Sequence, residues 1–403
     1  MESGLFNNVA VFPENKNWDN CTQRIEHLNP RKDDIRSEFE RDYNRILHCT
    51  AYRRLKHKTQ VFYATRNDHI CSRIEHVNHV TSVSYTISKY LGLNTELTRA
   101  IAIGHDLGHS PFGHSGERIL NRIATKEINS TFWHEKNGLR IVDNIELLED
   151  EEGNQKNLNL TYAVRDGIIS HCGEVNENSI FPRINYIDLA IINKPNEYQP
   201  YTWEGCVVKI ADKISYLGRD IEDAYNLNIL NASQIEELKL IVGVNINNIN
   251  NTILMHKFIT DLCANSSPAN GICLSDEMFQ LLNNIKDFNY KNIYKHQRLI
   301  NYFKYAELVI DLIYSSLFGF YNNNNTLEQL IKEEQSFPIL CKSFSNWINK
   351  YSISTEHNLI NHNTKYTLYN INKINDYKLA CIDFIASLTD FAAINIFNEL
   401  TSF

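Results

Sequence analysis

The stretch Ala102–Glu117, AIGHDLGHSPFGHSGE, places three histidines, one aspartate and one glutamate among four glycines. Histidine binds metals and exchanges protons near neutral pH, and glycine lets neighbouring groups approach the backbone closely. This combination predicts a metal site, a general acid–base site, or both. The alternative is a chance cluster, so the rest of the chain has to supply matching residues.

An apolar helix is predicted directly before this cluster, in LTRAIAIG (97–104). His105 and His109 are four residues apart, so they share one helical face if the helix continues that far. We expect Pro111 to end the helix, because proline lacks the N–H that a helix interior needs. His114 and Glu117 are then expected on the following turn.

A second helix is predicted upstream, from about residue 73 to 91. Helical spacing places five residues on one face of it: His76, Val80, Val83, Ile87 and Tyr90. His76 therefore points inward, whereas His79 lies off this face and is expected at the surface. A single inward histidine is more often a hydrogen-bonded core residue than a metal ligand, so His76 alone leaves both interpretations open.

A third helix is predicted downstream, in KIADKISYLGRDIEDA (209–224). Asp212, Tyr216 and Asp220 are spaced by four residues and form one polar stripe. A solvated acidic face explains this stripe equally well. However, His76, His105 and Asp106 need one more carboxylate to complete the mixed nitrogen and oxygen ligand set of Mn²⁺, Fe²⁺ or Mg²⁺. An aspartate of this stripe could supply it.

Basic residues and a further histidine add groups suited to phosphate chemistry. Arg53 belongs to a basic run, AYRRLKHKTQVF (51–62), which by itself indicates a solvated face. Arg73 lies one turn before His76, and a guanidinium there can bind phosphate oxygens in a bidentate manner. His134 and Glu135 form an adjacent pair capable of acid–base chemistry, although the start of a helix is the alternative explanation.

Composition and periodicity predict an all-α protein. The chain has 403 residues, 43% of them hydrophobic, with only eight prolines and fifteen glycines. Long segments have apolar residues at three- and four-residue spacing, and 183–203 is the segment expected to form a loop. We expect a catalytic core at residues 1–235 and an additional helical portion at 236–403 that packs on it.

Charge and cysteine content exclude some classes of function. The net charge of −8 gives no overall basic surface for nucleic acid. Nine scattered cysteines without a CxxC pair predict reduced thiols in a cytoplasmic protein. The N-terminus has no secretory signal pattern, and no apolar stretch reaches the length of a membrane span.

The ordered set His76, His105–Asp106 and Asp212 resembles the pattern of HD-domain phosphohydrolases. Five motifs narrow the resemblance to the deoxyguanosinetriphosphate triphosphohydrolase family: YRRLKHKTQVF, RIEH, HDLGHSPFGHSGE, WEGCVVKIADKISYLGRDIEDA and CIDFIASLTDFA. The resemblance covers about residues 40–225 and recurs at 381–392. It implies the helical HD-domain fold, with an additional C-terminal helical portion.

The resemblance also implies residue roles. The metal ligands would be His76, His105, Asp106 and Asp212. The groups around the phosphates would be His109, His114, Glu117, His134 and Glu135. The substrate-binding residues would be Arg53, Gln60, Arg73, Tyr216 and Asp220, with Gln60 and Asp220 on the 3′-hydroxyl and Tyr216 against C2′. One departure is Glu135, since many bacterial relatives have His-Asn where this chain has His134-Glu135.

The implied reaction is cleavage of a deoxynucleoside triphosphate, dGTP above all, into the deoxynucleoside and intact triphosphate. It implies a divalent metal, Mn²⁺ or Mg²⁺, with Fe²⁺, Co²⁺, Zn²⁺ and Ni²⁺ as alternatives. It also implies a homo-oligomer, a hexamer or tetramer, with a deoxynucleoside triphosphate or single-stranded DNA as effector. The rival interpretations are another HD-domain nucleotidase, a pyrophosphohydrolase, and a non-catalytic module that senses nucleotides or single-stranded DNA.

Overall fold

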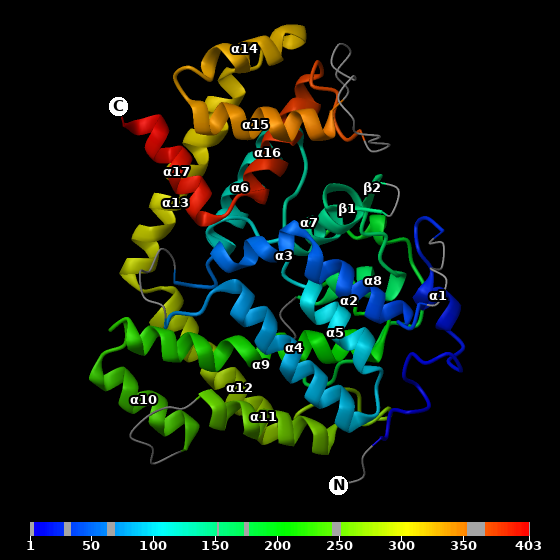
Figure 1. Cartoon of the computed structure of the whole chain (residues 1–403). Helices are drawn as coiled ribbons and strands as arrows, with labels where there is room; N and C mark the ends of the chain where they lie inside the picture. Colours follow the sequence, from blue (N-terminus) through cyan, green and yellow to red (C-terminus); the bar gives the residue numbers. More distant parts are fainter. Residues whose placement is uncertain are drawn as a thin grey trace. The chain divides into compact units, whose positions relative to one another are not determined.

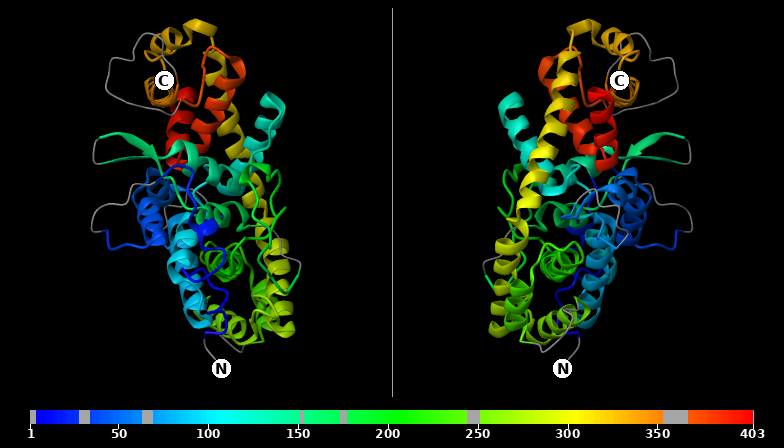
Figure 2. Two further views of the ribbon diagram at one scale, coloured as in Figure 1. Left: turned by 90° about the vertical axis from the view of Figure 1, so that its right-hand side faces the viewer. Right: turned by 90° about the vertical axis from the view of Figure 1, so that its left-hand side faces the viewer.

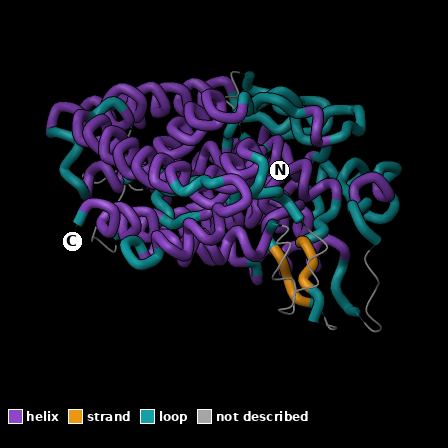
Figure 3. Tube along the Cα trace, turned by 90° about the horizontal axis from the view of Figure 1, so that it is seen from above, coloured by secondary structure: helices purple, strands orange, loops and turns teal. Residues whose placement is uncertain are grey.

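The computed structural model describes residues 4–27, 34–62, 69–150, 153–172, 177–243, 251–352 and 367–402, and most of them are helical (Figure 1). Within these ranges the only strands are β1 (Leu147–Glu149) and β2 (Gln155–Asn157), drawn in orange in Figure 3. They pair antiparallel, with Leu148 opposite Lys156. The prediction of an all-α protein is confirmed.

Contacts within the chain divide it into two compact units. The first unit comprises residues 1–48, 65–106 and 159–301, and the second comprises 49–64, 107–158 and 302–403. Each unit is assembled from three separate segments, which tertiary packing brings together. The division of the chain near residue 235 stays a prediction.

The first unit is built on four helices that share one core: α4 (Arg73–Leu91), α5 (Thr95–Gly104), α8 (Tyr162–Ser170) and α9 (Trp203–Asn226). Five more helices surround them: α1 (Trp18–Thr22), α2 (Glu38–His48), α10 (Ala232–Val242), α11 (Asn251–Asn265) and α12 (Asp276–Asn289). The helices α11 and α12 pack along α9, as the two side views show (Figure 2). The segment 183–203 is mostly irregular, as predicted, with one short turn of helix at Leu189–Ile191.

The bounds of α4 agree with the predicted helix and have a local cause. Ser72 and Glu75 form a capping box at its start, and Gly92 ends it with a left-handed φ of 82°. His76 is buried on the inward face, as expected. The expectation for His79 was wrong: this side chain is half-buried, because α4 is covered on more than one side.

The helix before the histidine cluster, α5, does not continue as far as His109. It ends at Gly104, and His105 is its C-cap, so His105 and His109 do not share a helical face. Close packing explains why glycine stands at this end. A Cβ on Gly104 would lie 2.9 Å from the side chain of Ile168 and 3.0 Å from that of Ile46.

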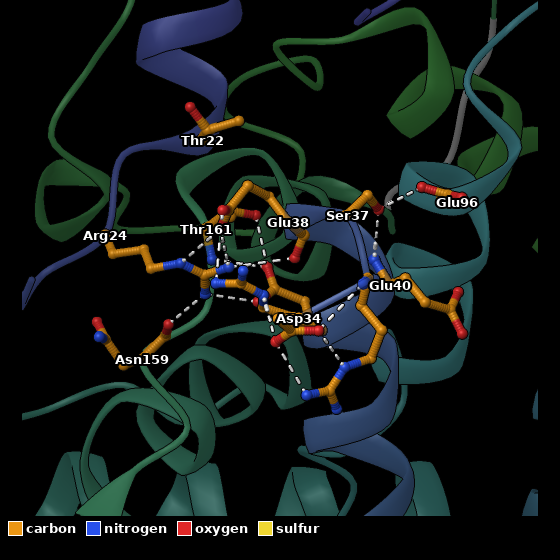
Figure 4. Close-up of polar contacts among 12 residues, drawn as sticks. Thr22, Arg24, Asp34, Ser37, Glu38, Glu40, Glu96, Asn159 and Thr161 are labelled. Carbon is orange, nitrogen blue, oxygen red and sulfur yellow. Dashed lines mark hydrogen bonds and ion pairs between the residues drawn. The ribbon is translucent and has the colours of Figure 1, made fainter. Parts of the chain in front are cut away.

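A polar network fixes the start of α2 in the first unit (Figure 4). Arg24 donates hydrogen bonds to the carboxylates of Glu38 and Asp42, at 2.8 Å and 2.6 Å. Thr161, at the start of α8, donates its hydroxyl to the same Asp42 at 2.6 Å. These bonds satisfy a carboxylate that is fully buried, which would otherwise be costly.

The second unit holds the remaining α-helices of the described residues. They are α3 (Thr50–Arg54), α6 (Gly113–Ile128), α7 (His134–Arg140), α14 (Thr326–Glu333), α15 (Pro338–Tyr351), α16 (Ile374–Ser387) and α17 (Asp390–Thr401). The helix α13 (Gln297–Gly319) begins in the first unit and continues into the second, where α6 packs on α16. In the described part of the chain no single helix is long and apolar enough to cross a membrane; α16 and α17 reach that length only together, with a bend of 118° between them.

Candidate metal site and histidine cluster

His76 and Asp212 meet in the first unit, because α4 packs on α9. His76 Nε2 lies 2.9 Å from Asp212 Oδ1 and 3.8 Å from Asp106 Oδ2. The hydrogen bond and charge of His76 outweigh the effect of burial on Asp212 and hold the pKa of this carboxyl near 2. Asp212 therefore stays ionised at neutral pH, as a metal ligand must.

His105 turns its second ring nitrogen to the same place. Its Nδ1 lies 2.6 Å from the backbone oxygen of Ala102, so Nδ1 carries a proton and donates it. In the neutral imidazole the other nitrogen, Nε2, is the one with the lone pair. It is buried without a hydrogen bond, 3.5 Å from Asp106 Oδ1 and 3.8 Å from Asp212 Oδ1.

These side chains fit a divalent cation. The metal-binding atoms of His76, His105 and Asp212 all lie within 4.8 Å of one another. A buried imidazole nitrogen with no hydrogen bond, surrounded by carboxylates, is the arrangement expected of a ligand whose tautomer is fixed by its other nitrogen. Two nitrogens and two carboxylates suit Mn²⁺, Fe²⁺ or Mg²⁺.

His171 belongs to this group, and the sequence reasoning missed it. His105, Asp106 and His171 also form a set whose ligand atoms lie within 4.8 Å. His171 is the C-cap of α8, and its Nδ1 lies 2.8 Å from the oxygen of Ile168, three residues earlier. The available signal was that both histidines directly follow an apolar helix, but only the packing of α5 on α8 brings the two helix ends together.

Arg73 provides the counter-charge of Asp106. Its guanidinium donates a hydrogen bond of 2.6 Å to Asp106 Oδ2, and the side chain is only 2% exposed. This ion pair compensates a buried carboxylate and orients its other oxygen towards His105. The role of Arg73 as a phosphate contact stays a prediction.

Two further aspartates of α9, Asp220 and Asp223, are buried, so the alternative of a solvated acidic face is wrong for them. Asp220 and Asp223 are each 2% exposed, whereas Tyr216 is half-buried. Tyr294 donates its hydroxyl to Asp220 Oδ2 at 2.5 Å. No local pattern indicates this partner, because Tyr294 lies 74 residues further along the chain.

The first prediction concerns Asp220 and the pH dependence of stability. Burial raises the pKa of Asp220 from its ordinary value of 3.8 to about 7. The unfolded chain therefore ionises this group first, and Asp220 lowers the free energy of unfolding as pH rises from about 4 to 7. The shift corresponds to about 4 kcal/mol at neutral pH. Asp220→Asn removes this pH-dependent loss of unfolding free energy. The variant should therefore be more stable than the parent at pH 8 but not at pH 4.5.

Urea unfolding at the two pH values measures this difference. Glu222→Gln on the same helix is the matched control and should leave the pH dependence of the parent unchanged. An Asp220→Asn protein that loses stability between pH 4.5 and 8 as steeply as the parent would contradict the prediction.

The second unit holds the other predicted histidines in a separate cluster. Glu117 Oε2 lies 3.1 Å from His114 Nδ1 and 3.1 Å from His134 Nδ1. The ring of His109 stacks on that of His134, with 4.0 Å between the centroids. The ligand atoms of these four residues lie within 4.8 Å of one another. His114 is the exposed member: 65% of its side chain is accessible to solvent.

The position of His114 and Glu117 differs from the prediction. Both lie in the first turns of α6 and not on an irregular turn. The helix begins directly after Phe112, its N-cap residue, which has a left-handed φ of 67°. Gly108 lets this segment approach α7 closely, since a Cβ there would lie 1.8 Å from the backbone oxygen of His134.

Glu117 is held in its charged form. Burial alone would raise the pKa of this carboxyl, but the charges and hydrogen bonds of His134 and His114 hold its pKa well below the ordinary value. Glu135 is 1% exposed, and its Oε2 lies 3.3 Å from His134 Nδ1. Glu117 therefore orients the rings of both His134 and His114 through hydrogen bonds, whereas Glu135 Oε2 lies beside His134 without a hydrogen bond.

Two predicted substrate residues lie in the second unit outside this cluster. Arg53 is exposed on α3, and Gln60 is half-buried in the segment that follows. Their roles, like those of Tyr216 and Asp220, stay predictions.

Comparison with known proteins defines first the class and then the family. The model of the HD domain matches residues 73–217, which contain His76, His105, Asp106 and Asp212. The chain therefore contains an HD domain, and the matched segment includes all four predicted ligands.

Curated relatives extend the match well beyond this domain. Proteins named deoxyguanosinetriphosphate triphosphohydrolase-like from Caldanaerobacter subterraneus subsp. tengcongensis and Desulfatibacillum aliphaticivorans are 34% and 36% identical over 293 residues. The matches cover 72% of this chain and 74% and 75% of the relatives. A protein of the same name from Rickettsia felis is 31% identical over 385 residues, 91% of this chain and 92% of the relative. The chain belongs to the family of deoxyguanosinetriphosphate triphosphohydrolase-like proteins.

Proposed function

We propose that this protein is a metal-dependent triphosphohydrolase of deoxynucleoside triphosphates, with dGTP favoured. The coarser assignment, an HD-type phosphohydrolase, follows from the matched domain and the family. One observation carries the proposed metal dependence: the buried Nε2 of His105 makes no hydrogen bond and lies against the carboxylates of Asp106 and Asp212. His76 completes a ligand set that the HD domain spans.

In this proposal His76, His105, Asp106 and Asp212 hold a divalent cation, Mn²⁺ or Mg²⁺. When bound, such a cation supplies Lewis-acid polarisation of a phosphate oxygen and of the attacking water. Arg73 orients Asp106 and adds positive charge beside the ligands.

Release of a deoxynucleoside and intact triphosphate fixes which bond breaks. Water attacks the α-phosphorus, and the bond between this phosphorus and the 5′ oxygen breaks. The leaving group is a 5′-alkoxide, which needs a proton as it departs. We assign this proton to His114, oriented by Glu117, with His134 as the rival donor.

Recognition of the sugar is assigned to Gln60, Asp220 and Tyr216. A pocket that hydrogen-bonds a 3′-hydroxyl rejects analogues without it, because its own polar groups would be left unpaired. Tyr216 placed against C2′ would exclude a 2′-hydroxyl by its bulk. The loss of Gln60 should therefore change substrate preference more than the rate of the chemical step.

A product assay tests the function. The purified protein is incubated with each of the four dNTPs and with GTP, in Mn²⁺ or Mg²⁺, and the phosphorus products are identified by ³¹P NMR. Intact triphosphate with deoxynucleoside, fastest from dGTP and absent from GTP, is expected. Orthophosphate or pyrophosphate would place the protein in another branch of HD enzymes. No product in dNTP mixtures and with single-stranded DNA present would favour a sensing module.

Assembly and regulation follow from the same proposal. We propose a homo-oligomer, a hexamer or tetramer, activated by a deoxynucleoside triphosphate or by single-stranded DNA. Sedimentation with and without these effectors measures both properties.

A further inference from the structure

The motif CIDFIASLTDFA (381–392) contains a buried aspartate, Asp390, that the proposed reaction does not use. Asp390 is the first residue of α17 and is 7% exposed. Its Oδ1 accepts a hydrogen bond of 2.8 Å from the backbone N–H of Phe112. Its Oδ2 accepts one of 3.0 Å from the backbone N–H of Thr59 and another from the Thr59 hydroxyl. One carboxylate thus binds two segments of the second unit that lie far apart in the sequence.

Both segments border residues of the proposed reaction. Phe112 is two residues before His114, and Thr59 is directly before Gln60. Phe112 has a φ of 67°, a region that side chains larger than hydrogen rarely adopt, so its conformation needs support from outside the segment. The hydrogen bond to Asp390 supplies this support at the residue where α6 begins.

Lys58 holds the other end of the same turn. Its buried ammonium group donates hydrogen bonds to the backbone oxygen of His109 and, at 3.1 Å, to that of Ala386. The segment from His109 to Phe112 is therefore fixed at both ends by charged side chains in the second unit. A rigid turn of this kind sets the direction of the helix that follows it.

We propose that Asp390 is a positioning residue that sets the orientation of the His114–Glu117 pair and of Gln60. The inference rests on the proposed function for its effect on rate, and on the hydrogen bonds above for its effect on structure. Asp390→Asn tests it, since the amide NH₂ faces a backbone N–H that needs an acceptor. Thr59→Val removes only the hydroxyl donor, and Thr59→Ser keeps both donors.

A matched control exists in the first unit. Asp261 accepts hydrogen bonds of 2.7 Å from the backbone N–H and from the hydroxyl of Ser275, as Asp390 does from Thr59. Asp261→Asn removes the same chemistry from a place that holds no proposed catalytic group. It should shift the melting temperature and leave kcat unchanged.

The readouts are kcat, KM, melting temperature and amide hydrogen exchange of residues 112–118. Asp390→Asn should lower kcat about 10- to 100-fold with KM changed less than about threefold, and the amides of 112–118 should exchange at least about tenfold faster. Thr59→Val should show a smaller effect of the same kind, and Thr59→Ser should match the parent. A change in melting temperature alone, as in Asp261→Asn, would overturn the inference.

The two proposals fail in different ways. A parent protein that forms triphosphate, with an Asp390→Asn variant of unchanged kcat and exchange, overturns the positioning role and leaves the function intact. A parent protein that forms no triphosphate from any substrate overturns the function. The exchange of residues 112–118 then decides the role of Asp390 by itself: faster exchange supports it, and unchanged exchange overturns it.

Discussion

Replacing His105 by alanine should abolish metal binding and lower kcat on the order of 10³-fold or more. The reason is that His105 Nε2 is a buried lone pair with no hydrogen bond, facing the carboxylates of Asp106 and Asp212. Without it, two carboxylates and His76 hold the cation less tightly and in the wrong geometry. Metal content after loading with Mn²⁺ and desalting gives a readout that does not depend on activity, and the rate of triphosphate release gives the second.

His79→Ala is the matched control for the metal site. His79 lies on the same helix as His76, three residues further on, and is half-buried, but it belongs to none of the ligand groups. The variant should retain both metal and activity. His105→Ala with full metal content and full activity would disprove the assignment of the site. If His79→Ala also lost both metal and activity, the losses would reflect disturbed packing of α4 and not the removal of a metal ligand.

Replacing His114 by alanine should lower kcat on natural dNTPs by about 10²- to 10³-fold. His114 is the exposed member of its cluster and is oriented by Glu117, which suits a group that meets the leaving oxygen. A dNTP analogue with sulfur in place of the 5′ oxygen distinguishes proton donation from other roles. Its leaving group is a thiolate, which departs without a proton far more readily than an alkoxide does.

The expected result is a difference between the two substrates. His114→Ala should lose less than about tenfold on the sulfur analogue, because the general acid is no longer needed there. His134→Ala, tested in the same way, identifies the rival donor. Equal losses on both substrates in His114→Ala, with the selective pattern in His134→Ala, would transfer the role of proton donor to His134.

Glu117→Gln extends this test to the orienting carboxylate. Its pKa is held well below the ordinary value, so Glu117 is charged at every pH used for the assay. The variant keeps the shape of the side chain but loses the charge that both imidazoles face. The loss of kcat in Glu117→Gln on natural substrates should approach the loss in His114→Ala. On the sulfur analogue the loss of kcat should be smaller, as it is for His114→Ala.

The sequence by itself determined the helices that carry the metal site. The apolar face that includes His76 predicted a helix from about residue 73 to 91, and the structure confirms these bounds. The order of His76, His105, Asp106 and Asp212 indicated the HD-domain class, and five longer motifs indicated the family; the matched domain and the relatives confirm both. These features were readable because helix signals and motif spacing act over short stretches of chain.

Other parts of the site depended on contacts that no local pattern encodes. His171 joins His105 only because α5 packs on α8, and Tyr294 reaches Asp220 across 74 residues of sequence. Asp390 belongs to a recognised motif, yet its partners Thr59 and Phe112 lie 331 and 278 residues away.

The end of α5 at Gly104 was misjudged for a related reason. Local spacing allowed the helix to continue to His109. In the structure it ends at Gly104, where the backbone lies close to Ile46 and Ile168, and Phe112 adopts a left-handed φ before the next helix begins. The sequence therefore determined which residues can bind a metal or carry a proton, since that is a property of each side chain and its immediate neighbours. The tertiary structure decided which of them meet, because burial and helix packing join segments that are remote in the chain.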